Sequence, residues 1–203
     1  VKRLFASGVD GIALFGTTGE GQSFALRERR DGLEALIAAG VDARRVLAGT
    51  ACAALPETIE LTRHALACGC AGVLVLPPFF FKGVSDDGVY ASYARIVEGV
   101  GDARLRLYLY HIPQVTGVPL PVEVIARLAT AFPSTVAGIK DSSSDLAHAR
   151  ALQSSSIEAF RVARNRYLQR EAVLSDVVKV QSSLADADED AGEDAPRHGA
   201  VRR

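Results

Sequence analysis

Several groups that could take part in covalent chemistry each follow a short apolar run in this sequence. They are Lys140 after VAGI, Tyr110 at the end of LRLYLY, and Thr17 with Thr18 after GIALFG. A lysine amine that is partly removed from water loses its proton more readily and can attack a ketone to form a Schiff base. A tyrosine can carry the proton that this reaction moves, and the hydroxyls and amides of a turn can hold a carboxylate. Together these residue types describe a site for a 2-keto acid.

Each of these residues also has a purely structural interpretation. Lys140 could extend from a strand end into solvent, Tyr110 could be a core aromatic residue, and the two threonines could shape a turn. The chain has only four lysines against nineteen arginines, which makes a lysine directly after an apolar run more suggestive. The prediction therefore depends on all the groups converging at one place.

The apolar runs that carry these groups alternate with helical patterns. The runs are residues 11–16, 46–50, 71–78, 105–113 and 136–140. They are apolar on both faces, which is typical of parallel strands that are covered on each side. Helices are predicted over 24–39, from Pro56 to Gly69, after a cap at Ser85, and from Pro121 to a stop before Pro133. The first residues of the chain read as the end of a further helix.

Strands that alternate regularly with helices predict an α/β fold with a parallel sheet. Such a sheet is either open and doubly wound or closed as a (β/α)8 TIM barrel. The turn FGTTGEG at 15–21 lacks the glycine spacing of a dinucleotide-binding sheet, which favours the barrel. The carboxyl ends of barrel strands meet at one rim, where active groups lie.

The composition limits the class of protein. The chain has 203 residues and a formal charge of −1, which suits one sizeable domain and gives no reason to expect nucleic acid or an anionic membrane as partner. It has no apolar run of about 18 residues and no secretory signal pattern. Cys52, Cys68 and Cys70 lack the spacing of a zinc site. We therefore expect a cytoplasmic protein with reduced thiols, no metal and no cofactor.

Three motifs resemble the dihydrodipicolinate synthase / N-acetylneuraminate lyase family of class I pyruvate-dependent aldolases. They are GTTGE at 16–20, YHIPxxTG at 110–117 and GIKDSS at 138–143, and the resemblance covers roughly residues 1 to 152. It implies a (β/α)8 barrel, a homo-tetramer, and a lyase that joins or releases pyruvate, or a related 2-keto acid, and an aldehyde.

The resemblance also implies a role for each site residue. Lys140 would form the Schiff base, and Tyr110 would relay protons. Thr17 and Thr18, beside Gly16, would bind the keto-acid carboxylate, and Thr18 would join the proton relay.

The chain departs from the synthase pattern at several positions. Val115 stands where the synthase has an arginine that anchors the carboxylate of the aldehyde, and Phe79 with Phe80 stand where it has two tyrosines. These departures favour a less charged or sugar-derived aldehyde over the lysine-pathway substrate. We expect His111 and Gln114 to offer polar contacts to that substrate.

The glycine- and proline-marked turns stop well before the end of the chain. The predicted organisation is a partial TIM-barrel aldolase domain over 1–152, an atypical helical segment over 153–183, and an acidic, disordered tail over 184–203. The partial barrel would lack the first strand and the last two. The alternatives are a truncated, non-catalytic remnant that binds a keto acid, and an interaction protein that works through its tail.

Overall fold

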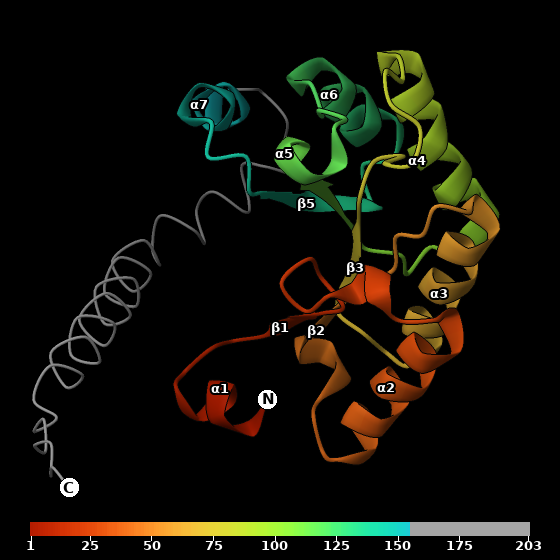
Figure 1. Cartoon of the computed structure of the whole chain (residues 1–203), viewed down its shortest axis with the longest axis vertical. Helices are drawn as coiled ribbons and strands as arrows, with labels where there is room; N and C mark the ends of the chain where they lie inside the picture. Colours follow the sequence, from red (N-terminus) through yellow and green to blue (C-terminus); the bar gives the residue numbers. More distant parts are fainter. Residues whose placement is uncertain (155–203) are drawn as a thin grey trace, which may run out of the picture. The chain divides into compact units, whose positions relative to one another are not determined.

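The computed structural model describes residues 1–154, apart from the side chain of Gln153, and these residues alternate strands with helices (Figure 1). The strands are β1 (Ile12–Leu14), β2 (Val46–Gly49), β3 (Gly72–Val75), β4 (Leu107–His111) and β5 (Val136–Asp141). The helices are α1 (Lys2–Ala6), α2 (Leu26–Ala38), α3 (Leu55–Ala67), α4 (Asp86–Val100), α5 (Pro113–Thr116), α6 (Val122–Ala131) and α7 (Leu146–Ser154), with 3-10 turns at Gly21–Ser23 and Ala43–Arg45. The expected helical segment and acidic tail lie outside the described residues, except that 153 and 154 end α7. The domain boundary at residue 152 stays a prediction.

The five strands form one parallel sheet in which every strand lies next to the strand that follows it in sequence, in the order β1-β2-β3-β4-β5. A doubly wound sheet reverses its strand order at a switch point, whereas this sequential order is that of a barrel wall. The helices α2, α3, α4 and α6 pack against one another in the same order along the sheet (Figure 1). The predicted α/β class and partial (β/α)8 TIM barrel are confirmed.

The helix boundaries follow from local sequence. The Ser85 hydroxyl accepts a hydrogen bond of 3.2 Å from the Gly88 amide and caps α4, which ends at Gly101 with a left-handed φ of 64°. Pro56 lies in the first turn of α3, and Pro121 directly precedes α6. Within residues 1–154, no helix combines the length and apolarity needed to cross a bilayer.

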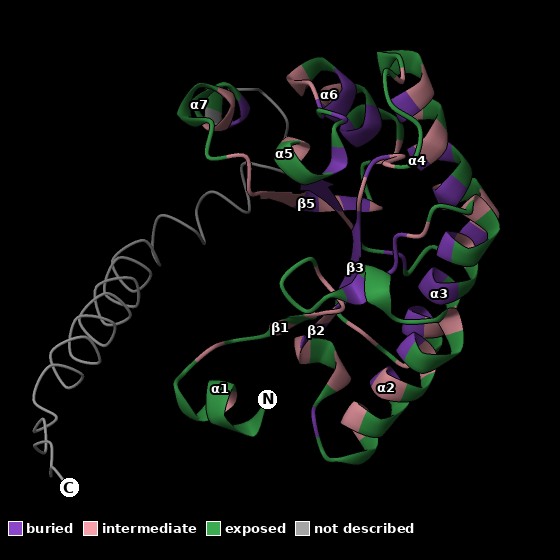
Figure 2. Ribbon diagram, viewed as in Figure 1, coloured by how far each residue is buried: buried purple, intermediate pink, exposed green. Residues whose placement is uncertain are grey.

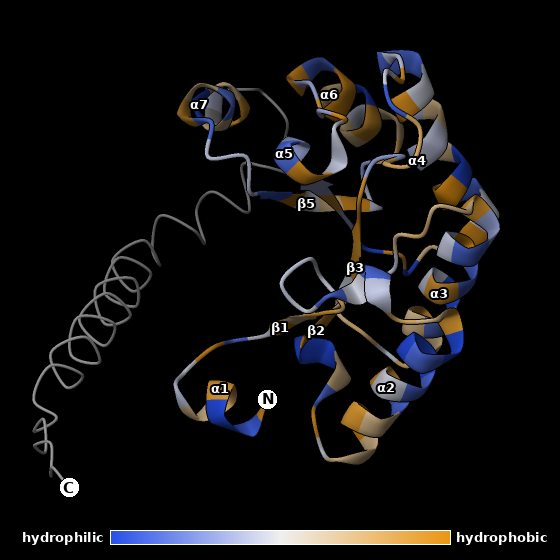
Figure 3. Cartoon of the chain, viewed as in Figure 1, coloured by the Kyte–Doolittle hydropathy of each residue, from blue (hydrophilic) through white to orange (hydrophobic). Residues whose placement is uncertain are grey.

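The strands present different surfaces on their two faces. Alternate residues pack beneath the helices and are almost completely buried: Val46, Val73, Val75, Leu107 and Leu109. A smaller cluster of Leu74, Tyr110 and Ile112 packs on the opposite face, which corresponds to the barrel interior. The central strand β3 is accordingly buried along its whole length (Figure 2) and hydrophobic (Figure 3).

An irregularity in the pairing of β4 with β5 determines which face Lys140 occupies. Leu107 pairs with Val136, but the next residue, Tyr108, pairs with Gly138, so that β5 carries one extra residue. Because side chains alternate between the faces of a strand, one extra residue moves everything beyond it to the other face. Lys140 therefore pairs with Tyr110 on the interior face.

The turn after β1 depends on two glycines. Phe15 follows the strand with φ of 58°, a left-handed conformation that is uncommon for a non-glycine residue. Its carbonyl oxygen comes so close to the neighbouring chain that a β-carbon would lie 2.1 Å from it at Gly21 and 2.3 Å from it at Gly49. These glycines allow the turn that delivers Thr17 to the carboxyl end of the sheet.

We predict that Gly49→Ala destabilises the fold by about 1–3 kcal/mol, because the new methyl group must displace the Phe15 carbonyl. Gly19→Ala is the matched control, since a β-carbon there meets its nearest atoms at an ordinary 3.7 Å in the same turn. Urea unfolding of both variants measures the difference. Equal midpoints for the two variants would show that the close approach at Gly49 does not matter.

Candidate active site

Lys140 and Tyr110 lie side by side at the carboxyl ends of β5 and β4. The Lys140 Nζ donates a hydrogen bond of 3.1 Å to the Tyr110 hydroxyl and lies 4.2 Å from the centre of its ring. Tyr110 is only 3% exposed, and Lys140 is half-buried. The amine is therefore held beside a phenol. The purely structural interpretation of Lys140 required the amine to extend into solvent, which it does not do.

The surroundings of Tyr110 favour loss of its proton. Burial by itself would raise the pKa of the phenol, but hydrogen bonding by Thr17, Lys140 and Ser142, together with the charge of Lys140, lowers that pKa below its ordinary value of 10.0. A phenol with a lowered pKa gives up and recovers a proton more easily near neutral pH. Tyr110 is thus suited to transfer protons to and from a group bound at Lys140.

A cavity of about 340 Å³ opens beside this pair. Gly16 and Thr17 line it together with Tyr110, whereas neither Thr18 nor Lys140 is among the described lining residues, and Lys140 contacts the lining residue Tyr110. The structure thus brings together Lys140, Tyr110, Thr17 and Gly16, and places Thr18 in the same turn but outside the described cavity lining.

The far wall of the cavity is largely apolar. Leu74, Leu76, Phe79 and Val115 contribute to it, and Val115 is 56% exposed. Glu20 is the only charged side chain among the described lining residues, and none of them is a cation. The wall therefore has no group that would pair with a second carboxylate on a substrate.

Hydrogen bonds between loops hold this wall in place, and the sequence did not reveal them. The Lys82 Nζ donates to the carbonyls of Phe79 at 2.5 Å and Thr116 at 2.6 Å. The Gln114 Nε2 donates to the Ser142 carbonyl at 2.5 Å. Gln114 therefore braces the loop after β5. Ser142, which helps to lower the pKa of Tyr110, is marked in the sequence only by its place two residues after the lysine in the GIKDSS motif.

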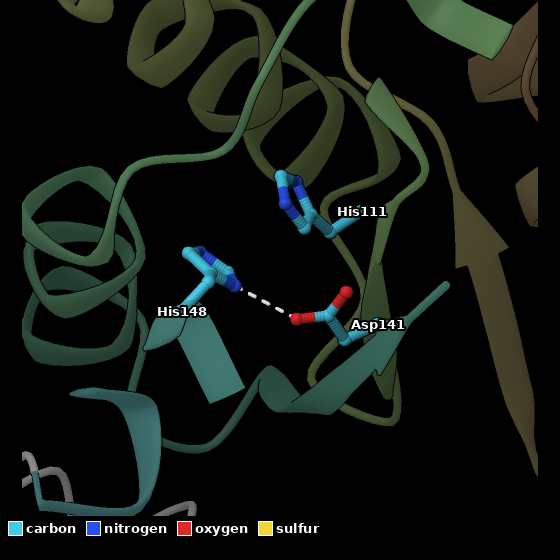
Figure 4. Close-up of side chains that lie close together, drawn as sticks. All are labelled: His111, Asp141 and His148. Carbon is cyan, nitrogen blue, oxygen red and sulfur yellow. Dashed lines mark hydrogen bonds and ion pairs between the residues drawn. The ribbon is translucent and has the colours of Figure 1, made fainter. Parts of the chain in front are cut away.

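The expectation that His111 contacts substrate is wrong. His111 is 4% exposed and lies on the helix-facing side of β4, because it follows Tyr110 and strand side chains alternate. Its Nδ1 accepts a hydrogen bond of 3.1 Å from the Leu120 amide, and its ring stacks on that of His148 at 4.2 Å. Figure 4 shows both rings beside Asp141, whose Oδ2 lies 2.7 Å from the His148 Nδ1.

The cluster of His111, Asp141 and His148 resembles a metal site by composition, because one ligand atom from each lies within 4.8 Å of the others. The hydrogen bonds oppose that assignment. The His111 Nδ1 is occupied by the Leu120 amide, so its proton is on Nε2, and the His148 Nε2 faces the Leu120 carbonyl at 2.9 Å. The His148 Nδ1 is itself hydrogen-bonded to the Asp141 Oδ2, so the cluster does not offer the three or four protein ligands that zinc takes.

We predict that His111 makes the folded chain less stable as the pH falls below 6.5, the ordinary pKa of histidine. Burial, and next the nearby His148, lower the pKa of His111 from 6.5. The unfolded chain then binds more protons than the folded chain between the two pKa values, so the free energy of unfolding decreases as the pH falls below 6.5. Urea unfolding at a series of pH values should show a shallower decrease for His111→Gln. An unchanged slope would contradict this prediction.

Comparisons with known proteins agree with these features. A family model described as the dihydrodipicolinate synthetase family matches residues 1–162. An uncharacterized DapA-like lyase of Chloroflexus aurantiacus is 40% identical over 152 residues, which are 75% of this chain and 50% of that protein. Dihydrodipicolinate synthase of Agrobacterium tumefaciens matches with a TM-score of 0.72 and 39% identity over 74% of this chain and 53% of that one. YagE of E. coli K12, a prophage protein of the dihydrodipicolinic acid synthase family solved in complex with pyruvate, matches with a TM-score of 0.67 and 28% identity over 81% and 52%.

The sequential parallel sheet with its helices defines the class of α/β barrel proteins. Within that class, the chain belongs to the dihydrodipicolinate synthetase family, as its three motifs predicted. It spans about half the length of the curated relatives that it matches.

Proposed function

We propose that this chain carries the keto-acid site of a Schiff-base lyase or aldolase acting on pyruvate or a related 2-keto acid. The observation that carries the proposal is the 3.1 Å hydrogen bond between the Lys140 amine and the Tyr110 hydroxyl at adjacent strand ends. Membership of the dihydrodipicolinate synthetase family and the similarity to a protein solved with pyruvate support it.

The proposed reaction uses the amine as a nucleophile. The Lys140 amine attacks the C2 carbonyl, the carbinolamine loses water, and a protonated imine remains. The imine accepts the electron pair of an adjacent bond, so that a C–C bond to an aldehyde can break or, in reverse, form. Tyr110 takes and returns the protons of these steps. Thr17 and the backbone at Gly16 bind the carboxylate of the keto acid, and a relay role for Thr18 stays a prediction.

The apolar wall supports a proposal about the second substrate. The described lining offers Val115 and Phe79 but no cation, so an aldehyde that carries no carboxylate at this wall is favoured over the lysine-pathway substrate. Initial rates with 2-keto-3-deoxy sugar acids, and with aspartate semialdehyde plus pyruvate, test this directly. A clear preference for aspartate semialdehyde would contradict it.

Reductive trapping tests the proposed function itself. The full chain is incubated with pyruvate and sodium cyanoborohydride, and peptides are mapped by mass spectrometry. We expect a stable adduct on the peptide that contains Lys140. Intact, folded chain without that adduct would contradict the proposal.

The alternative function is a protein that binds a keto acid without C–C chemistry. It predicts the same trapped adduct with no turnover of any aldehyde. The homo-tetramer implied by the family also stays a prediction, which analytical ultracentrifugation checks.

A further inference from the structure

The residues that follow Tyr110 and Lys140 form a second linked pair on the opposite face of the sheet. His111 pairs with Asp141 in the strand register, one position beyond the pairing of Tyr110 with Lys140. His148 of α7 lies over both, stacked on His111 and bonded to Asp141. We propose that His148, held between the Asp141 carboxylate and the Leu120 carbonyl, is a positioning residue that fixes Lys140 against Tyr110. This inference rests on the proposed function.

Both ring nitrogens of His148 are engaged by oxygen atoms of other elements. Its Nε2 lies 2.9 Å from the Leu120 carbonyl oxygen, which can only accept, so this nitrogen must carry a proton. Its Nδ1 lies 2.7 Å from the Asp141 Oδ2. Burial would raise the pKa of Asp141, but hydrogen bonds from Ser143 and His148 lower it, so the carboxylate accepts as well. His148 therefore links the Asp141 carboxylate to the Leu120 carbonyl through its two ring nitrogens.

The two histidine rings bind the backbone of one residue, Leu120. The Leu120 amide donates to the His111 Nδ1, and the Leu120 carbonyl accepts from the His148 Nε2. The segment before α6 is thereby joined to the end of β4 and to the first turn of α7. That first turn is itself fixed, because the Asp145 carboxylate accepts from the amides of Ala147 and His148.

The same network reaches the loop that supports Tyr110. The Asp141 Oδ1 accepts from the Ser143 amide at 2.9 Å and the Ser143 hydroxyl at 2.6 Å. The Ser142 amide donates to the His111 carbonyl at 2.8 Å. Because a hydrogen bond to a carboxylate is stronger than one between neutral groups, loss of the bond between His148 and Asp141 loosens the end of β5 at the residue next to Lys140. The expected consequence is a less well oriented amine with an unchanged cavity for pyruvate.

The test compares His148→Gln with His64→Gln in the full chain. His64 is a matched control because it also pairs with a carboxylate at 2.7 Å, that of Glu34, but lies on α3 away from the site. The rate of cyanoborohydride trapping of pyruvate at Lys140 is measured against pyruvate concentration. We expect His148→Gln to lower the maximal rate roughly tenfold to a hundredfold with little change in the half-saturating concentration. His64→Gln should leave both unchanged.

A second variant, Asp141→Asn, and a second measurement, the acetylation of Lys140, test the same inference independently. Asp141→Asn should lower the maximal rate in the same way, and thermal unfolding identifies any variant that does not fold. Acetylation of Lys140 by acetic anhydride, relative to the exposed Lys2 of the same molecule, measures the freedom of the amine without pyruvate. We expect faster acetylation in His148→Gln because the amine leaves Tyr110.

The two readouts separate the inference from the proposed function. If the wild-type chain forms no pyruvate adduct, the proposed function fails, and the acetylation ratio still decides whether His148 positions Lys140. A folded His148→Gln chain with a wild-type acetylation ratio would overturn the inference. So would a change that appears only in the half-saturating concentration.

Discussion

Replacing Lys140 with alanine is expected to abolish the borohydride-trapped pyruvate adduct, because no other lysine among the described residues lies beside a phenol at the cavity. Lys140→Arg should fail equally, since a guanidinium keeps the charge but does not act as a nucleophile at neutral pH. Intact-mass spectrometry after reduction measures the adduct. Thermal unfolding of each variant establishes that the loss is chemical rather than structural.

The other described lysines provide the controls for this result. Lys2→Arg removes an exposed amine on α1 and should leave the adduct unchanged. Lys82 is the more stringent comparison, because it lies near the cavity but donates to two backbone carbonyls. An adduct mapped to Lys82, or one that persists in Lys140→Ala, would show that the wrong amine has been assigned.

Tyr110→Phe is expected to lower the rate of Schiff-base chemistry by about 10²- to 10⁴-fold, the contribution usual for a positioned proton donor. The ring should still pack against Leu74 and Ile112, so the fold and the affinity for pyruvate should change little. The pKa of Tyr110 is lowered in the folded chain, so the phenol should lose its proton at a pH below the ordinary value of 10.0. The wild-type rate should therefore fall at a pH below 10.0. That fall should be absent from the variant.

Tyr108→Phe is the matched control for this experiment. Tyr108 lies two residues earlier on the same face of β4 and packs against the same small cluster. Stopped-flow or single-turnover trapping of the adduct compares the two variants. Equal losses for both would mean that the hydroxyl of Tyr110 has no special role and that the aromatic face as a whole matters.

The order of the strands and helices could be predicted from the sequence because it depends on local patterns. Apolar runs of strand length, proline at the first turn of α3, and the Ser85 cap each act over a few residues. The choice of a barrel over a doubly wound sheet depended on a glycine spacing that the 15–21 turn lacks. Each of these features depends only on residues that are close together in the sequence.

The contacts of His111 and Gln114 could not be predicted in this way. Both follow Tyr110 in one motif, so both were expected to face the substrate. The strand alternation instead turns His111 toward the helices, and Gln114 donates to a carbonyl 28 residues further along the chain. His148, which lies in an ordinary helical stretch, becomes a partner of Asp141 only when α7 folds over β5.

The sequence by itself determined which groups stand at the strand ends, because local apolar patterns define each strand and the next residues in the sequence define its end. Only the tertiary structure decided that Lys140 faces Tyr110, because the extra residue in β5 sets the register and every later side chain follows it. Without that residue, Lys140 would pair with His111 beneath the helices. Pairing between distant strands depends on packing across the whole sheet, which no local stretch of sequence encodes.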